Sequence, residues 1–432
     1  MCYNTNTNQT GRQKRITNTI QIQIVPDPGK ENSMIYLDNA ATTKMTKHAM
    51  DAMIPYMNEV YGNPSSLHSA GQTAKEALEN ARDRIAAILN AEPREIFFTS
   101  GGSEADNQAI LSAAEHGERK GKRHIISTAF EHHAVLHTLD RLKKRGFEIT
   151  LLDVHGDGIV TAEQVRDAIR EDTVLVAVMF ANNEIGTVQP IEEIGRVCRE
   201  RGVLFHTDAV QAAGHLEIDV KKQNIDLLSL SSHKFHGPKG AGVLYAKKGV
   251  RLVNVIEGGA QERGKRAGTE NIPAIMGMAA ALEDAAEHLG EYAARMRGLR
   301  DRLIAGLSEI PHAVLNGDRE HRLPNNVSFC FLGIEGESLL LLLDDRGIAA
   351  SSGSACTSGS LDPSHVLLAI GRPHEIAHGS LRLTLSHETT AEEIDRTIEA
   401  VKDVVSYLRS ISPVWRDLAA GKQIFITPEK SA

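Results

Sequence analysis

Short apolar runs alternate with stretches of helical periodicity over most of this chain. From residue 46 to about 290, helix-like segments fall at 69–89, 104–120 and 191–201, and strand-like segments at 96–99, 124–127, 175–180, 203–206, 227–230 and 242–245. Continuous apolar runs are typical of strands buried on both faces, and their alternation with helices is typical of parallel βαβ units. The sequence therefore predicts an α/β fold with a mostly parallel sheet flanked by helices.

The pattern changes after a long helical stretch that ends near residue 309. Strands at 326–331 and 381–385 and helices at 336–346 and 391–409 then predict a smaller α+β domain. We expect a large domain at 34–290 and a small domain at 291–432, with residues 34–45 as candidates for addition to the small one. Residues 1–33, which are polar and rich in Asn and Thr, are interpreted as a disordered extension or, alternatively, as a targeting segment.

Composition excludes several classes of protein. The net charge of −8 favours neither nucleic acid nor an anionic membrane as a partner. Apolar runs such as 174–181 and 339–343 are far shorter than the ~20 residues that span a bilayer. The four cysteines, at positions 2, 198, 330 and 356, form no CxxC pair and are too few for a disulfide framework. We therefore expect a reducing compartment, the cytoplasm, and no membrane span.

The segment LLSLSSHKFHGPKG at 227–240 places a lysine directly after a buried strand. Ligands of open α/β folds bind at the carboxyl ends of strands, where Lys234 would lie. An amine flanked by Ser231, Ser232 and His233 suits a cofactor that carries both an aldehyde and a phosphate. A surface lysine in a basic loop is the alternative that this segment alone leaves open.

Two further segments point to the same edge of the sheet. In VLFHTDAVQ a strand delivers Asp208, whose carboxylate can pair with a protonated ring nitrogen; an N-cap aspartate is the alternative. In FFTSGGSEADN a strand leads through Gly101 and Gly102 into a helix that begins near Ser103. Backbone N–H groups and the helix dipole favour an anion there, although an ordinary N-cap turn has the same pattern.

Polar side chains follow two more strands. His132 is placed to lie flat over an aromatic ring, and Asn183, in ANNEIG, to present its amide to the site; a turn is the alternative for the Asn pair. His133 and His137, four residues apart on a predicted helix, suggest a metal. No HExxH motif or carboxylate partner completes that site, so we do not favour it.

One loop has an unusual composition, AASSGSACTSGS at 349–360. It has no large side chain to anchor it, so we interpret Cys356 as a reactive thiol on a mobile arm rather than a buried structural cysteine. Cys198 and Cys330 are predicted to be core residues. Arg382, in GSLRLTL, offers a planar fork for a substrate carboxylate, or is a surface arginine on an edge strand.

Together these motifs resemble the cysteine desulfurases of the NifS/IscS type. The resemblance starts at YLDNAATT (36–43), continues through GNPSSLHSAG (62–71), and ends at SPVWRDL (412–418); QERGKRAGTEN at 261–271 is most similar to the NifS branch. Two features depart from the family: Gly102-Ser103, where a different small residue and a threonine are frequent, and the N-terminal extension.

The resemblance implies a fold-type I enzyme that uses pyridoxal 5'-phosphate, as a homodimer with the active site near the subunit interface. Lys234 would bond covalently to the cofactor, His132 would stack on its ring and Asp208 would pair with its nitrogen. The implied contacts to the phenolic oxygen and the phosphate, directly or through the neighbouring subunit, are Gln211, Gly102, Ser103, Ser231, Ser232, His233 and Thr269. Asn183, which is also placed beside the cofactor, and Arg382 would bind the substrate carboxylate.

The implied reaction removes sulfur from L-cysteine, giving L-alanine and a persulfide on Cys356. Lys234 is the expected general base. The sulfur would pass to an iron–sulfur scaffold protein or another acceptor, and Cys356 is also a candidate transient ligand of an iron–sulfur species through its persulfide. A selenocysteine lyase, an aminotransferase and a non-catalytic sulfur carrier or scaffold are the alternatives.

Overall fold

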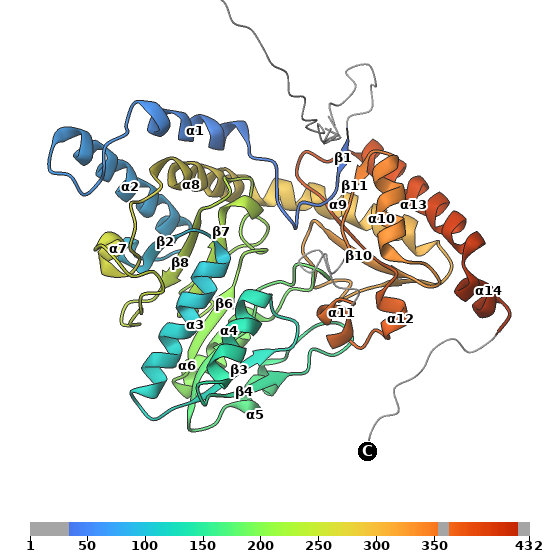
Figure 1. Cartoon of the computed structure of the whole chain (residues 1–432), viewed down its shortest axis with the longest axis horizontal. Helices are drawn as coiled ribbons and strands as arrows, with labels where there is room; N and C mark the ends of the chain where they lie inside the picture. The colour runs from blue at the N-terminus through green and yellow to red at the C-terminus, as the bar shows by residue number, and fades with distance from the viewer. Residues whose placement is uncertain (1–33, 353–362, 422–432) are drawn as a thin grey trace, which may run out of the picture. The chain divides into compact units, whose positions relative to one another are not determined.

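The computed structural model describes residues 34–352 and 363–421. Its largest element is a seven-stranded sheet in the order β2-β8-β7-β6-β5-β3-β4 (Figure 1). The strands are β2 (Ile96–Thr99), β3 (His124–Thr128), β4 (Glu148–Leu152), β5 (Thr173–Ala177), β6 (Leu204–Asp208), β7 (Leu227–Ser231) and β8 (Gly242–Ala246). Pairings from β7 to β4 are parallel, whereas β8 runs antiparallel to both β7 and β2. The predicted mostly parallel sheet is confirmed, with β8 as its reversed strand.

Helices cover both faces of this sheet because its inner strands are apolar on both sides. Strands β3, β5 and β7 are buried along their whole length. Phe97, Ile125 and Leu175 pack on one face with α3 and α4, and residues such as Phe98 and Phe205 pack on the other with α2, α6 and α8. These helices are α2 (Ser69–Ile88), α3 (Gly102–Glu118), α4 (His133–Lys143), α6 (Ile191–Arg201) and α8 (Ile272–Glu287), with α1 (Lys47–Asn58), α5 (Ala162–Ala168) and the short α7 (Gln261–Gly264) nearby.

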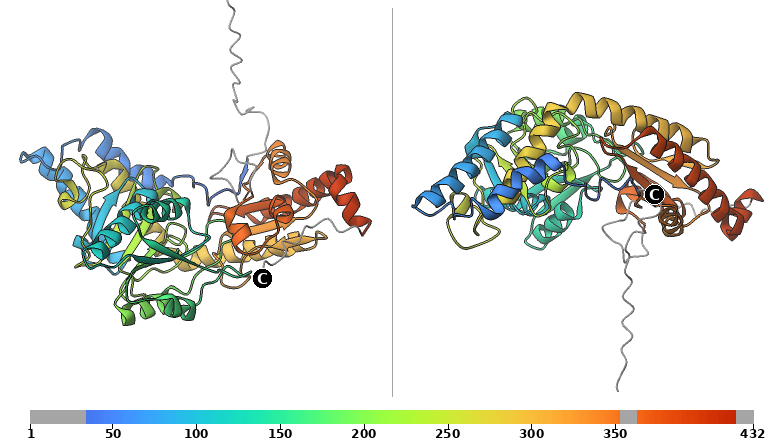
Figure 2. Two further views of the ribbon diagram at one scale, coloured as in Figure 1. Left: turned by 60° about the horizontal axis from the view of Figure 1, so that its bottom comes forward. Right: turned by 90° about the horizontal axis from the view of Figure 1, so that it is seen from above.

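A second core forms around a three-stranded antiparallel sheet, β12-β10-β9 (Figure 2). Its strands are β9 (Ala313–Leu315), β10 (Asn326–Phe331) and β12 (Ser380–Thr384), with α9 (Leu289–Ser308), α10 (Gly336–Asp345), α11 (His365–Ala369), α12 (His374–Ala377), α13 (Ala391–Ile411) and α14 (Pro413–Ala419). The described residues form one compact unit, so the division at residue 290 into two domains stays a prediction.

The chain segment around residue 36 belongs spatially to this second core. Strand β1 (Ile35–Tyr36) pairs in parallel with β11 (Ile348–Ala349), and Ile35 and Leu37 are buried among the apolar residues of the second core. This pairing carries residues 38–43 past the end of β12, where Asn39 Nδ2 donates to the Thr384 carbonyl oxygen at 2.8 Å. The N-terminal segment thus brings its own residues next to both sheets.

Within the described ranges, no helix combines the length and apolar character needed to span a bilayer. The prediction that Cys198 and Cys330 are core residues is confirmed, since both are fully buried. The expected disordered extension, residues 1–33, lies outside the described residues.

Candidate active site

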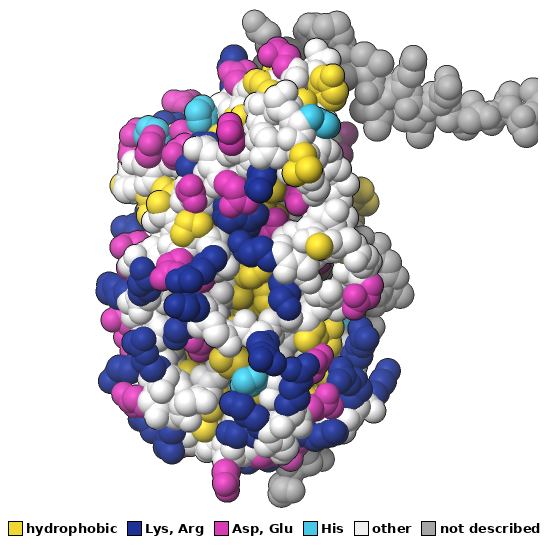
Figure 3. All heavy atoms as spheres, turned by 90° about the vertical axis from the view of Figure 1, so that its left-hand side faces the viewer, with side chains coloured by type: hydrophobic (Ala, Val, Ile, Leu, Met, Phe, Trp, Pro, Cys, Tyr) yellow, Lys and Arg dark blue, Asp and Glu magenta, His cyan; other side chains and the backbone are white. Residues whose placement is uncertain are grey.

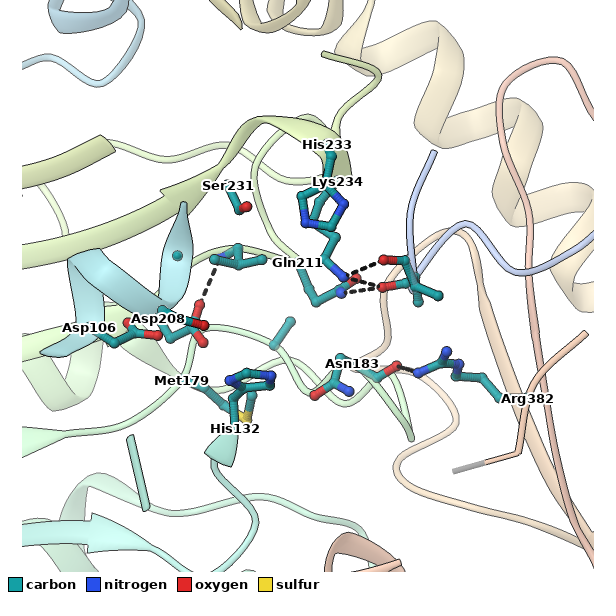
Figure 4. A pocket seen from close by; sticks show the side chains of 16 residues that line it. Asp106, His132, Met179, Asn183, Asp208, Gln211, Ser231, His233, Lys234 and Arg382 are labelled. Atoms are coloured by element: carbon teal, nitrogen blue, oxygen red, sulfur yellow. Dashed lines mark hydrogen bonds between the residues drawn. The ribbon is translucent and has the colours of Figure 1, made fainter. Parts of the chain in front are cut away.

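A cavity of about 220 Å³ opens where the parallel strands β5, β6 and β7 end (Figure 4). This is the edge at which open α/β sheets bind ligands. The cavity is lined by Ala40, Ala41, Gly102, Ser103, Asp106, His132, Met179, Ala181, Asn183, Asp208, Val210, Gln211, Ser231, His233, Lys234 and Arg382. The fold therefore brings together residues from the N-terminal segment, the large sheet and β12.

One end of the cavity is built to approach an anion closely. Helix α3 begins at Gly102, and its first N–H groups have no side-chain cap. A Cβ on Gly102 would meet Val210 Cγ2 at 2.6 Å, so the helix start packs directly against Val210 and a larger residue would force Val210 to move. Ser103, Ser231 and His233 add polar groups around the same helix end. Together with the helix dipole, this arrangement suits a phosphate.

The amine of Lys234 is held in the cavity by the N-terminal segment. Lys234 lies in the 3-10 turn Ser232–Lys234 that follows β7, and its Nζ donates to the carbonyl oxygens of Ala40 at 2.7 Å and Ala41 at 2.8 Å. Gln211 Nε2 donates to the Ala40 oxygen at 3.0 Å. Figure 4 shows the side chains of Lys234 and Gln211 pointing toward the same stretch of backbone, whose oxygens accept these bonds. An amine there is positioned to react with an aldehyde in the cavity.

Asp208 lies at the end of β6, and its carboxyl group is buried. Among the described residues it forms no salt bridge with a cation. Its Oδ1 accepts the N–H of Val210 at 2.9 Å. Burial, together with the nearby Asp106 carboxyl, raises the pKa of Asp208 to about 7. A cationic ring nitrogen in the cavity would supply the missing partner. Asp106, from α3, was not predicted, and burial raises its pKa to about 7 as well.

His132 caps α4 and remains neutral. Its Nδ1 accepts the N–H of Ala134 at 3.1 Å, which fixes the orientation of the imidazole. Burial, followed by the charge of Lys234, lowers the pKa of His132 to about 4. A neutral imidazole beside the cavity is suited to lie against an aromatic ring, since no charge has to be desolvated.

Arg382 is buried and already fixed by two partners. Its Nη1 donates to the Asn183 carbonyl oxygen at 3.1 Å, and its Nη2 pairs with Asp38 Oδ1 at 3.0 Å. Its Nε is buried with no hydrogen-bond partner among the described residues. The guanidinium thus has donor capacity left for an anion, while Asp38, which the sequence did not single out, holds it in place.

Three predicted site residues are not in the cavity lining. Ser232 is fully buried and packs against Gly237, where a Cβ would meet Ser232 Oγ at 2.1 Å. Thr269 is exposed to solvent. Cys356 lies outside the described residues. The predicted roles of these residues remain predictions.

The histidines considered for a metal do form a cluster. The ring of His133 lies 5.0 Å from that of His137 and 4.6 Å from that of His365, between centroids. No set of three His, Cys, Asp or Glu residues in the described part of the chain has the geometry of a metal site.

The residues that directly follow the segment 353–362 form hydrogen bonds with two loops of the site. Ser364 Oγ donates to Glu184, beside Asn183, and His365 Nε2 donates to the Glu131 carbonyl oxygen at 3.0 Å, beside His132. Before the segment, Ser351 N and the Arg382 oxygen pair at 3.2 Å, and Arg382 N and the Ser351 oxygen at 2.6 Å. Both ends of the segment that contains Cys356 are thus fastened to the site. Sequence reasoning missed these partners, which lie far apart in the chain.

The aminotransferase class-V family matches residues 35–397. A cysteine desulfurase IscS from Clostridium botulinum is 54% identical over 395 residues, which are 91% of this chain and 99% of the relative. One from Methanosarcina thermophila is 55% identical over 384 residues, 89% of this chain and 95% of the relative. A solved NifS-like protein has a TM-score of 0.82 at 40% identity, covering 87% of this chain and 100% of the other.

A NifS-like protein from Rickettsia africae has a TM-score of 0.79 at 30% identity, covering 86% of this chain and 99% of that one. The predicted fold is therefore confirmed, and with it the resemblance on which the site was interpreted. Closeness to the NifS branch in particular stays a prediction, because the clostridial and archaeal relatives both bear the name IscS. The chain belongs to the class-V aminotransferases and, within them, to the cysteine desulfurases of the NifS/IscS type.

Proposed function

We propose that this protein removes sulfur from L-cysteine, releases L-alanine and carries the sulfur as a persulfide on Cys356 for iron–sulfur cluster assembly. One observation carries the proposal: Lys234, Asp208, His132 and Arg382 converge on a single cavity at the carboxyl edge of the sheet. The chain in which they converge also covers 99% of a cysteine desulfurase at 54% identity.

The residues of the cavity fit pyridoxal 5'-phosphate. The start of α3, with Gly102 and Ser103, lines the cavity, and its uncapped N–H groups would hold the phosphate. Ser231 and His233 would add hydrogen bonds there. Asp208 is a desolvated carboxyl that a ring nitrogen would satisfy, His132 would cover the ring, and Gln211 would face its phenolic oxygen. When bound, this cofactor supplies an aldehyde for amines and an electron sink for charge that develops on a substrate Cα.

Arg382 and Asn183 would bind the carboxylate of L-cysteine. The buried Nε of Arg382 lacks a partner among the described residues, and the guanidinium is held rigidly by Asp38 and the Asn183 carbonyl. A guanidinium fixed in this way binds a carboxylate with little loss of side-chain entropy. The substrate would then lie with its Cα near Lys234 Nζ.

Lys234 would move the proton at Cα. Its Nζ is held by two backbone oxygens, of Ala40 and Ala41, which keep the amine over the cavity rather than in solvent. An amine fixed in this position can take a proton from the substrate and return it to the product.

Cys356 would accept the sulfur. Its thiolate attacks the Sγ of L-cysteine, the Cβ–Sγ bond breaks and an S–S bond forms; the carbon is reprotonated to alanine, so no external oxidant is needed. Cys356 is four residues beyond Ser352, and four residues span at most about 14 Å. Because the neighbouring Ser351 bonds to Arg382, this reach supports Cys356 as the acceptor.

We further propose a homodimer in which α1 is covered by a second copy. Met50, Ile54 and Met57 lie on one face of α1 and are 41%, 58% and 60% exposed, and Tyr61 beyond the helix is 80% exposed. Figure 3 views the side that carries α1, α2 and α7, where hydrophobic side chains reach the surface among Lys and Arg. Exposed apolar patches of this kind mark protein interfaces.

Three further expectations stay predictions. They are a location in the cytoplasm, transfer of the sulfur to an iron–sulfur scaffold or other acceptor, and transient binding of an iron–sulfur species by Cys356.

A single incubation tests the proposed reaction. The purified protein is supplied with pyridoxal 5'-phosphate and L-cysteine, and alanine, sulfide and the Cys356 peptide are measured. We expect alanine, and a persulfide that maps to Cys356. Cys356→Ala should abolish persulfide formation, whereas Cys330→Ala, which removes a buried thiol, should retain it. Absence of alanine with cofactor bound, or full sulfur release by Cys356→Ala, would refute the proposal.

A further inference from the structure

The turn around α7 has an unusual backbone. Glu262, Arg263 and Gly264 are consecutive residues with φ of 46°, 57° and 73°. Left-handed φ values are common for glycine but strained for glutamate and arginine. Two such residues in a row persist only where the surrounding structure holds them, and such strain gathers at functional sites.

A buried ion pair holds this turn. Arg82 on α2 donates from Nη2 to Glu262 Oε1 at 2.7 Å and from Nη1 to Oε2 at 2.9 Å, and the two side chains are only 3% and 2% exposed. Arg82 Nη1 also donates to the Ile96 oxygen at 2.7 Å, and the N–H of Phe98 donates to Glu262 Oε2 at 2.9 Å. The carboxylate of Glu262 is thus fastened to both α2 and β2.

The far side of the turn is fastened to α3. Arg266 Nε donates to Glu104 Oε1 at 2.9 Å, and Glu104 lies two residues beyond Gly102. Gln108 Nε2, also on α3, donates to the Lys265 oxygen at 2.7 Å. The turn is therefore fixed relative to the helix whose first turn forms the phosphate end of the cavity.

Thr269 follows this turn and does not line the cavity of its own chain. It is exposed, it is absent from the cavity lining, and it comes just before α8, which packs against α1. Val255 and Ile256, which precede the turn, are 40% and 39% exposed. In Figure 1, α1, α2 and α7 lie together at the left of the view. This is the side where the proposed dimer would place a second copy.

We propose that Glu262, through its ion pair with Arg82, is a positioning residue that presents Thr269 to the cofactor phosphate of a second copy of the chain. The inference rests on the proposed function and adds to it the ion pair that positions Thr269. The bidentate pair with Arg82 fixes both the position and the orientation of the Glu262 carboxylate. Because the backbone turns sharply at residues 262–264, fixing Glu262 also sets the path of residues 265–269.

The first test compares two ligands. Dissociation constants of pyridoxal 5'-phosphate and of pyridoxal, which lacks the phosphate, are measured by absorbance for four forms: wild type, Thr269→Ala, Glu262→Gln and Glu283→Gln. Glu283 is the matched control because it pairs with Arg84, also on α2, and does not touch the turn. We expect Thr269→Ala and Glu262→Gln each to weaken phosphate-ligand binding about tenfold with pyridoxal binding unchanged, and Glu283→Gln to match wild type.

The second test uses mixed dimers that pair a Glu262→Gln subunit with a Lys234→Ala subunit. The one site that keeps Lys234 then receives Thr269 from a subunit with intact Glu262, so we expect wild-type affinity to return. Weak binding that persists in the mixed dimer would show an effect within one subunit and overturn the inference. If Glu262→Gln does not fold, Arg82→Lys, which keeps the charge but loses the planar fork, takes its place.

The outcomes separate the two proposals. Wild-type affinity in Thr269→Ala would refute the proposed phosphate contact, and the inference with it. Weakened binding in Thr269→Ala with wild-type binding in Glu262→Gln would overturn the inference alone. Equal losses for pyridoxal and its phosphate in Glu262→Gln would reveal a general structural defect and would also overturn it.

Discussion

Replacing Asp208 with asparagine should stabilise the cofactor-free protein at neutral and higher pH. Burial raises the pKa of Asp208 from 3.8 to about 7 in the folded chain, so the folded state holds the proton more tightly than the unfolded state does. Between these two values the folded state binds more protons, and the free energy of unfolding falls as the pH rises. The loss is complete above about pH 7.

The magnitude follows from the width of that pH window. About three pH units at 1.36 kcal/mol each give a cost of about 4 kcal/mol at pH 8, and about one unit gives a cost of about 1–2 kcal/mol at pH 5. Asp208→Asn carries no charge and keeps an oxygen for the N–H of Val210. The free energy of unfolding of the variant should therefore exceed that of wild type by about 4 kcal/mol at pH 8 and by about 1–2 kcal/mol at pH 5.

Urea unfolding of cofactor-free protein at both pH values, followed by far-UV circular dichroism, measures the difference. Adding pyridoxal 5'-phosphate should stabilise wild type more than the variant, since only wild type offers an anion to the ring nitrogen. Asp226→Asn is the control: its carboxylate pairs with Lys247 Nζ at 2.8 Å, so its loss should destabilise at both pH values. A variant no more stable than wild type at pH 8, or an advantage that fails to shrink at pH 5, would refute the reasoning.

Three further changes test other parts of the site. Gly102→Val should weaken pyridoxal 5'-phosphate binding at least tenfold in a spectrophotometric titration, because its Cβ alone would meet Val210 Cγ2 at 2.6 Å and its two methyl groups would reach further; affinity equal to wild type would contradict the close packing of the helix start. Asp38→Asn removes the anionic partner of Arg382 and should raise the KM for L-cysteine about tenfold with a smaller change in kcat, whereas an unchanged KM would exclude Arg382 from substrate binding. Ile54→Asp, on the exposed face of α1, should shift the protein from dimer to monomer in analytical ultracentrifugation, and an unshifted dimer would place the interface elsewhere.

Elements with a strong local pattern were predictable from sequence. The fully buried runs that became β2 and β7 were located to within a residue, since continuous apolar runs between polar segments have few other interpretations. Strand β4 was missed because it lies at the sheet edge, where only Leu152 is buried and the apolar signal is weak. The reversed direction of β8 was missed too, because direction is set by connections and not by composition.

Some residues of the site were likewise predictable from local sequence patterns, and others were not. Lys234, Asp208 and His132 could be found because each follows a strand, and strand ends meet at one edge. Asp38 and the Ala40 carbonyl could not, because the pairing of β1 with β11, across more than 300 residues, is what brings them next to Arg382 and Lys234. Backbone acceptors in addition carry no side-chain signal. For the same reason the Arg82–Glu262 pair, 180 residues apart, is visible only in the folded chain.

The pairing of β1 with β11 has a consequence for the order of events during synthesis. Residues 35 and 36 leave the ribosome 313 residues ahead of their partners, 348 and 349. At about 5–20 residues per second, they wait roughly 15–60 s before they can pair. The seven-stranded sheet ends at residue 246 and can form within that interval. The turn that receives the Lys234 amine can be fixed only afterwards. A nascent chain interrupted before residue 348 would therefore not yet hold the Lys234 amine over the cavity.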